Sequence, residues 1–130
     1  MKTGPIVTAA VLILLSSCSF SGKPRSPYVE VCGDTLKVDT SVPGRDIEGF
    51  RGPVPLQVCV VAGKIADIRI LDNSETPRYL QKASEGLLPQ WKGLTVKKAL
   101  KLAPDAVSGA TWSSRAITDN MRIALEELSK

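Results

Sequence analysis

The sequence of 130 residues contains no histidine, and this absence excludes several classes of active site. A Ser-His-Asp triad, a Cys-His pair and imidazole acid–base catalysis all require histidine, as do nearly all catalytic zinc sites. Three cysteines are too few for the four thiolates of an iron–sulfur cluster, and we predict no metal site. The formal charge of +4 comes without basic runs, so nucleic acid is not an expected partner. Demanding chemistry therefore has to come from a bound cofactor or from carboxylates.

The first seventeen residues have the features of an export signal. Lys2 precedes a nearly unbroken apolar run over residues 6–15, shorter than the about 20 residues that span a bilayer. Leu15-Ser16-Ser17-Cys18 then resembles the bacterial lipobox, whose cysteine becomes the lipid-carrying first mature residue. The alternative is an ordinary signal peptide with an incidental Cys18. We predict a lipoprotein signal over residues 1–17, a lipidated tether over 18–27, and a location in the bacterial cell envelope, outside the cytoplasm.

The remaining residues, 28–130, form one predicted domain in which strands come first and helices follow. Alternating apolar residues predict strands over 28–38, with a break at 32–34, and over 54–62 and 65–71. A turn signal at residues 62–64 predicts that the last two strands form an antiparallel hairpin. Helical periodicity predicts helices over 78–88, after an N-cap at Thr95, and over 113–129. The predicted fold class is α+β, a small antiparallel sheet with helices packed on it.

Two of the cysteines fall in predicted strands, each on the face opposite its strand's valines. Because an exported protein meets an oxidising compartment, a disulfide between Cys32 and Cys59 is one interpretation. Two separate buried thiols are the other. The sequence leaves both open.

The junction into the last helix, residues 105–114 (DAVSGATWSS), gathers small residues and hydroxyls at a helix start. Free N–H groups and the positive end of the helix dipole favour a phosphate at such a place. Gly109 and Ala110 would let a bulky group approach the backbone. The simpler interpretation is an ordinary N-cap made by Thr111 or Ser113. From the residues alone, the N-cap is favoured.

The same junction resembles the signature of the FMN-binding domain family, Asp-x-x-Ser-Gly-Ala-Thr-x-Ser-Ser. Gly52-Pro53, the strand pair around Gly63-Lys64-Ile65 and then Glu75-Thr76-Pro77 follow the family's order upstream, so the resemblance covers about residues 49–128. The chain is similar to the FMN domains of the Rnf-complex G subunit and the sodium-translocating NADH:quinone reductase C subunit. It is shorter than both and looks like a small standalone member. It also departs from the family after Glu-Thr-Pro, where Arg78 and Tyr79 replace the usual glycines.

The resemblance implies that Thr111 carries FMN, esterified through the phosphate. A separate flavin transferase would attach the FMN with FAD as donor, reading a recognition sequence that maps onto Asp105, Ser108, Gly109 and Ala110. This chemistry needs no base within the chain, which agrees with the missing histidine.

Three further residues are candidate cofactor contacts: Trp112, Ser113 and Glu75. Trp112 could stack on the flavin ring, although an aromatic residue beside a helix start is more typical of core packing. Glu75 either hydrogen-bonds the flavin or caps the helix that follows it.

The predicted function is that of a membrane-anchored electron carrier, not an enzyme, with FMN on Thr111, lipid on Cys18 and unidentified redox donor and acceptor proteins. One alternative is a lipoprotein binding module of the same fold that holds flavin reversibly or not at all. Another is an enzyme that uses loosely held FMN. The intact Ser-Gly-Ala-Thr element favours the carrier, and the lack of a nicotinamide-binding fingerprint or acid–base pair counts against the enzyme.

Overall fold

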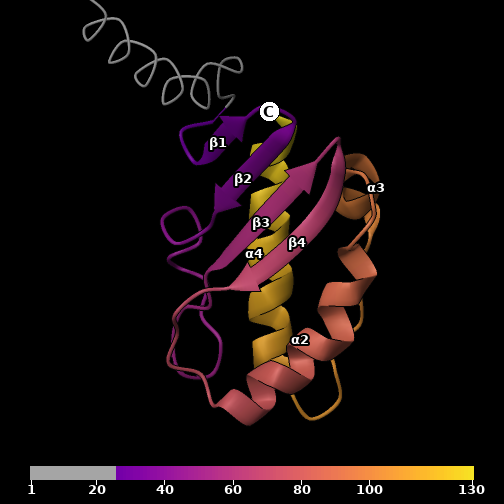
Figure 1. Ribbon diagram of the computed structural model, residues 1–130. Coiled ribbons are helices and arrows are strands. Elements are labelled where there is room, and N and C mark those ends of the chain that lie inside the picture. The colour runs from indigo at the N-terminus through magenta and orange to yellow at the C-terminus, as the bar shows by residue number, and fades with distance from the viewer. Residues whose placement is uncertain (1–25) are drawn as a thin grey trace, which may run out of the picture.

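The computed structural model describes residues 26–130, so the predicted signal, Cys18 and most of the tether lie outside the described residues. In this part of the chain four strands precede the helices (Figure 1): β1 (Val29–Cys32), β2 (Thr35–Asp39), β3 (Leu56–Val61), β4 (Lys64–Ile70), α2 (Pro77–Trp91), α3 (Val96–Lys101) and α4 (Thr111–Ser129). The prediction of a small α+β fold is confirmed.

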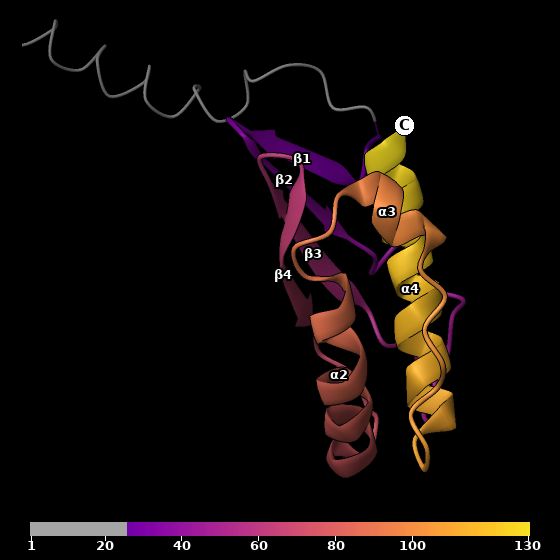
Figure 2. The same ribbon diagram turned by 90° about the vertical axis from the view of Figure 1, so that its right-hand side faces the viewer.

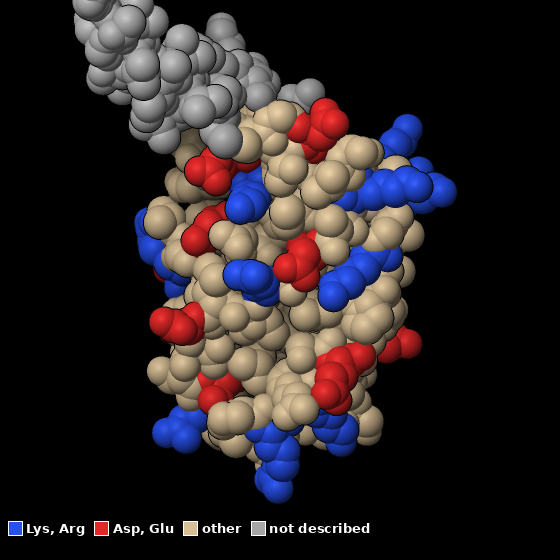
Figure 3. Space-filling view, in the orientation of Figure 1, with Lys and Arg blue, Asp and Glu red and all other residues tan. Residues whose placement is uncertain are grey.

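The sheet is an antiparallel meander in the order β1-β2-β3-β4, and the helices lie on one of its faces (Figure 2). Val38 of β2 pairs with Val29 of β1 on one side and with Val58 of β3 on the other. All three valines are buried, because alternate residues of a strand point toward the helices. The other face carries charged side chains of both signs (Figure 3).

The last helix supplies much of the core. Its predicted apolar stripe is buried as expected and consists of Ile117, Met121, Ala124, Leu125 and Leu128. A second helix, α2, lies beside it under the sheet and buries Ala83, Leu87 and Trp91 (Figure 2). The site described below is therefore held by a helix that is fixed along most of its length.

Two predicted elements differ from the structure. Residues 28–38 form the β1–β2 hairpin instead of one interrupted strand, because the chain reverses at residues 33 and 34. The helix predicted to end near Pro89 continues to Trp91. A proline in the last turn of a helix removes only one backbone hydrogen bond, and the buried Trp91 holds that turn against the core.

Other local predictions hold. Strands β3 and β4 form the expected antiparallel hairpin. Thr95 is the N-cap of α3, and its hydroxyl accepts a hydrogen bond of 3.2 Å from the Lys98 N–H group. None of the helices within residues 26–130 is long and apolar enough to cross a membrane.

Of the two interpretations left open for Cys32 and Cys59, the structure excludes a disulfide between them. Both cysteines lie on the face opposite the core, as predicted, but Cys32 is on β1 and Cys59 is on β3, with β2 between them. Neighbouring strands lie about 4.8 Å apart, so the two Cα atoms are more than about 9 Å apart, whereas a disulfide spans at most about 7 Å. The alternative of two separate thiols describes this pair, and both are half-buried.

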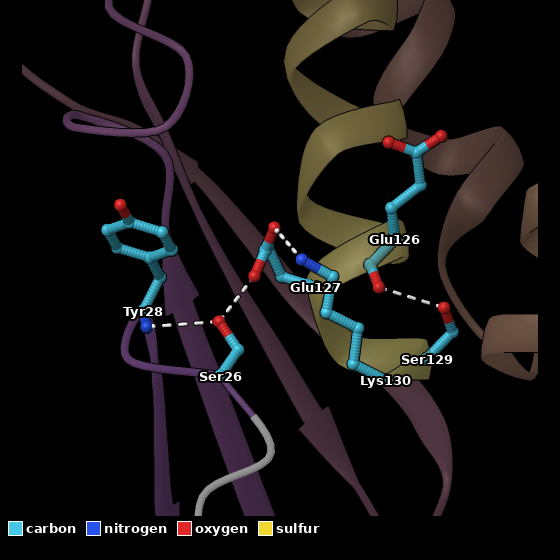
Figure 4. Close-up of polar contacts among 6 residues, drawn as sticks. All are labelled: Ser26, Tyr28, Glu126, Glu127, Ser129 and Lys130. Carbon is cyan, nitrogen blue, oxygen red and sulfur yellow. Dashed lines mark hydrogen bonds and ion pairs between the residues drawn. The ribbon is translucent and has the colours of Figure 1, made fainter.

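The described chain begins beside the C-terminal end of α4 (Figure 1). The Ser26 hydroxyl donates a hydrogen bond to the Glu127 carboxylate, which is also paired with Lys130 Nζ at 2.9 Å (Figure 4). These two contacts hold the pKa of Glu127 below its ordinary value of 4.5, and the hydrogen bond from Ser26 has the larger effect. Both ends of the described chain are therefore fixed together, at the end of α4 that lies opposite Thr111.

Candidate functional site

A tight turn leads into α4 and leaves the start of this helix without a side-chain cap. Gly109 has a φ of 82°, a left-handed conformation that favours glycine, and the Ala110 N–H donates to the Val107 carbonyl at 2.9 Å. Ala110 is the N-cap residue and has no oxygen to offer. The predicted cap by Thr111 or Ser113 is wrong, because both residues lie within the helix. The first N–H groups and the positive end of the dipole thus stay available to an anion.

The three hydroxyls of this helix start have different surroundings. Ser113 is 2% exposed and its hydroxyl donates to a Glu75 oxygen at 3.0 Å. Ser114 is 1% exposed and its hydroxyl accepts a hydrogen bond of 3.0 Å from the Val107 N–H group. Thr111, the first residue of α4, is exposed. Thr111 therefore presents the one hydroxyl of this helical turn that an outside reagent can reach.

The Glu75 carboxylate joins the start of α4 to the loop that contains Phe50 and Arg51, about 25 residues before Glu75 in the chain. It is 6% exposed and accepts hydrogen bonds from the N–H groups of Phe50 (3.0 Å) and Arg51 (2.5 Å) as well as from Ser113. Gly49 makes this approach possible, because a Cβ atom there would fall against Glu75 Oε1. The predicted cap on α2 is wrong, because Thr76 is the N-cap residue and no side chain caps this helix. The Glu75 oxygens are engaged by the protein itself and position the loop that carries Phe50. A hydrogen bond from Glu75 to the flavin stays a prediction.

Next to Thr111 lies an open pocket of about 250 Å³, close to the lower limit of about 300 Å³ for small-molecule sites. Three aromatic residues, Phe50, Tyr79 and Trp112, line it together with the turn from Gly109 to Ser113. The whole chain has only six aromatic residues, so half of them meet here. They come from three separate segments: the loop after β2, the first turn of α2 and the first turn of α4.

The aromatic residues of this pocket are unusually open to solvent. Phe50 is 68% exposed, Trp112 58% and Tyr79 40%. The expectation that Trp112 packs in the core is therefore wrong; its position as second residue of α4 turns it away from the buried stripe. Such aromatic surface costs free energy when it stays in water, and a planar apolar ligand would cover it.

Sequence reasoning missed Phe50 and Tyr79. Phe50 lies in a glycine-rich loop without periodicity, and Tyr79 interrupted the glycines expected from the family resemblance. The Arg78 guanidinium lies 4.9 Å from the centre of the Tyr79 ring and donates to its hydroxyl at 3.1 Å. One sequence signal could have pointed to these two residues as part of a site. Both are aromatic, in a chain with few aromatic residues, and both have mainly polar or glycine neighbours in the sequence, which is not typical of a core position.

The residues of the motif line two separate depressions. Ser108, Gly109 and Ala110 form the turn, and the last two line the aromatic pocket. Asp105 lines a separate open depression, together with Ser114, Arg115 and neighbouring residues. Asp105 thus lies beside the site rather than in the pocket.

This arrangement suits a planar aromatic ligand that carries an anionic group. Apolar walls accept the rings, and the uncapped helix start accepts the anion. A flavin with a phosphate has both parts, so the residues present fit FMN.

Comparisons with known proteins agree with this chemistry. A family model described as "FMN-binding domain" matches residues 49–126, which include all three pocket aromatics, Glu75 and the turn into α4. No curated protein and no solved structure matches the chain. Because the match covers more than half of the 130 residues, this chain belongs to the FMN-binding domain family.

Proposed function

We propose that this protein is an electron carrier that holds FMN covalently, through a phosphoester on Thr111, and is anchored to a membrane through Cys18. The position of Thr111 carries the proposal. Its hydroxyl is exposed at an uncapped helix start beside the aromatic pocket, whereas Ser113 and Ser114 are buried and hydrogen-bonded. FMN supplies the redox chemistry, and the protein sets its position and environment.

Attachment is a phosphoryl transfer carried out by a separate flavin transferase with FAD as donor. A bond forms between the Thr111 oxygen and the phosphorus of the FMN half, and the pyrophosphate bond breaks. AMP leaves, and the hydroxyl proton passes to the transferase. This chain has to supply only an accessible hydroxyl, in keeping with its lack of histidine.

The geometry supports anchoring through the N-terminal tether. The described chain starts beside Glu127, at the far end of α4 from Thr111 (Figure 1). A helix of 19 residues is about 28 Å long, so the two ends are well separated. A lipid attached upstream of Ser26 would leave the pocket open to a flavin transferase and to redox partner proteins.

Co-expression of the full chain with a flavin transferase tests the proposal. The wild type should gain the mass of one FMN minus water, fluoresce in a denaturing gel and stay yellow after acid precipitation. Thr111→Ala should remain folded and lose all three signals, because it removes the oxygen that forms the ester. Thr118→Ala, the same substitution further along α4, is the matched control and should be labelled like the wild type.

Two results would contradict the assignment of Thr111. A label on the Thr111→Ala variant would place the ester elsewhere, and peptide mass spectrometry would locate it. Flavin that dissociates from the wild type on acid precipitation would instead support the second candidate function, reversible flavin binding. The aromatic pocket favours that candidate as much as the first, because its walls do not depend on an ester.

A further inference from the structure

Lys82, on α2, reaches the turn that precedes Thr111. Its Nζ lies 3.0 Å from the place that a Cβ atom on Gly109 would occupy. The ammonium group can come this close to the turn because Gly109 has no side chain. Within residues 26–130 Lys82 has no carboxylate in ion-pair distance, whereas the cations Arg69, Lys92, Arg122 and Lys130 each have one.

The other cations near the helix start have different positions. Arg78 lies over the Tyr79 ring and donates to its hydroxyl. Arg115 lies one helical turn after Thr111 and lines the depression that contains Asp105, and it is not among the residues that line the pocket. Lys82 is thus the cation that the fold brings to Gly109, whose backbone lines the pocket.

We propose that Lys82 pairs with the phosphate group of the bound flavin. The inference rests on the proposed function, since it takes the phosphate to lie at the start of α4. A phosphodiester on Thr111 keeps one negative charge, and the uncapped N–H groups of α4 neutralise part of it. The Lys82 ammonium adds a mobile positive charge from α2, and a lysine serves a phosphate well as a point charge.

Riboflavin and FMN distinguish this role from a general effect on the pocket, because they share the ring system and differ in the phosphate. The unmodified full chain, produced without a flavin transferase, is titrated with each flavin at low salt. Lys82→Gln should weaken FMN binding about two- to fivefold, the range of an exposed ion pair, and leave riboflavin binding unchanged. The effect should shrink at high salt.

Two variants complete the test. Lys82→Arg keeps the charge and should keep most of the FMN affinity. Lys97→Gln, which removes an exposed lysine from α3, should change the affinity for neither flavin. Lys82→Gln should also slow the labelling of Thr111 by transferase and FAD, and Lys82→Arg should restore it.

The outcomes separate this inference from the proposed function. If the wild type binds FMN and becomes labelled on Thr111 while Lys82→Gln changes nothing, the role of Lys82 is refuted and the carrier function stands. An equal loss of riboflavin and FMN binding would also refute it, because the lysine would then act on the ring or the fold. If the unmodified wild type binds neither flavin, the pocket assignment and the Lys82 role fall together.

Discussion

Replacing Glu75 with alanine is expected to detach the Phe50 loop from α4 and to destabilise the domain. The substitution leaves three donors without their acceptor: the N–H groups of Phe50 and Arg51 and the Ser113 hydroxyl. A hydrogen bond to a charged group contributes about 1.5–3 kcal/mol. Water can reach the exposed loop and replace part of this, so we expect a loss of about 3 kcal/mol in the free energy of unfolding.

That loss is large for a domain of this size. Small domains have a free energy of unfolding of about 5–15 kcal/mol. Glu75→Ala should therefore remain folded at 25 °C but lose a large part of this free energy. For a domain of about 100 residues, 3 kcal/mol corresponds to a fall in Tm of about 12–24 °C. Urea unfolding followed by far-UV circular dichroism measures the global effect.

Two further variants sharpen the Glu75 test. Glu85→Ala, on the exposed side of α2, is the matched control and should change stability by less than about 0.5 kcal/mol. Gly49→Ala should destabilise in the same way as Glu75→Ala, because the added Cβ would fall against the Glu75 carboxylate. If the free energy of unfolding of Glu75→Ala is within about 0.5 kcal/mol of the wild-type value but the variant binds flavin poorly, Glu75 contacts the ligand, and the interpretation that it holds the Phe50 loop to α4 is refuted.

Two other predictions follow from burial and from the pKa of one carboxyl group. Trp112→Ala should cost less than about 1 kcal/mol of stability, because Trp112 is 58% exposed, yet weaken reversible flavin binding about fivefold through the loss of an aromatic contact; Trp91→Ala, in the core, should cost about 3–5 kcal/mol. Unfolding and flavin titrations on both variants check this, and equal stability losses would contradict it. The pKa of Glu127 is lowered in the folded state by Ser26 and Lys130, so its stabilising contribution is complete above pH 4.5 and is lost as the pH falls through the lowered value. The difference in unfolding free energy between wild type and Glu127→Gln should therefore shrink below pH 4.5, and a difference that grew there would show that the sign is wrong.

Local sequence patterns were sufficient for the elements whose structure depends on near neighbours. Alternating residues predicted the β3–β4 hairpin, the 3.6-residue period predicted the buried stripe of α4, and Thr95 was recognised as a cap. The order of motifs from Gly49 to Ser114 also pointed to the family, which the match over residues 49–126 confirms. Each of these signals lies within a short segment, so no knowledge of the packing was needed.

The first residue of a helix was harder to predict, because several neighbouring residues are suitable for the N-cap position. Thr111 and Ser113 both had suitable oxygens for an N-cap, yet the turn at Gly109 places Ala110 there. Ser113 then points to Glu75, and Trp112 points to solvent. A shift of two residues along a helix turns a side chain by about 200°, which is enough to exchange core for surface.

The sequence by itself determined the fold class and the motif that presents Thr111. Only the tertiary structure decided what surrounds this residue. Phe50 and Tyr79 line the pocket beside Thr111, and Glu75 bonds Ser113, because the fold brings together segments that lie 32 to 61 residues before Thr111 in the chain. The same meander keeps Cys32 and Cys59 apart by placing β2 between their strands. Periodicity records which face of an element is buried, but the partner of that face depends on how all the elements pack at once.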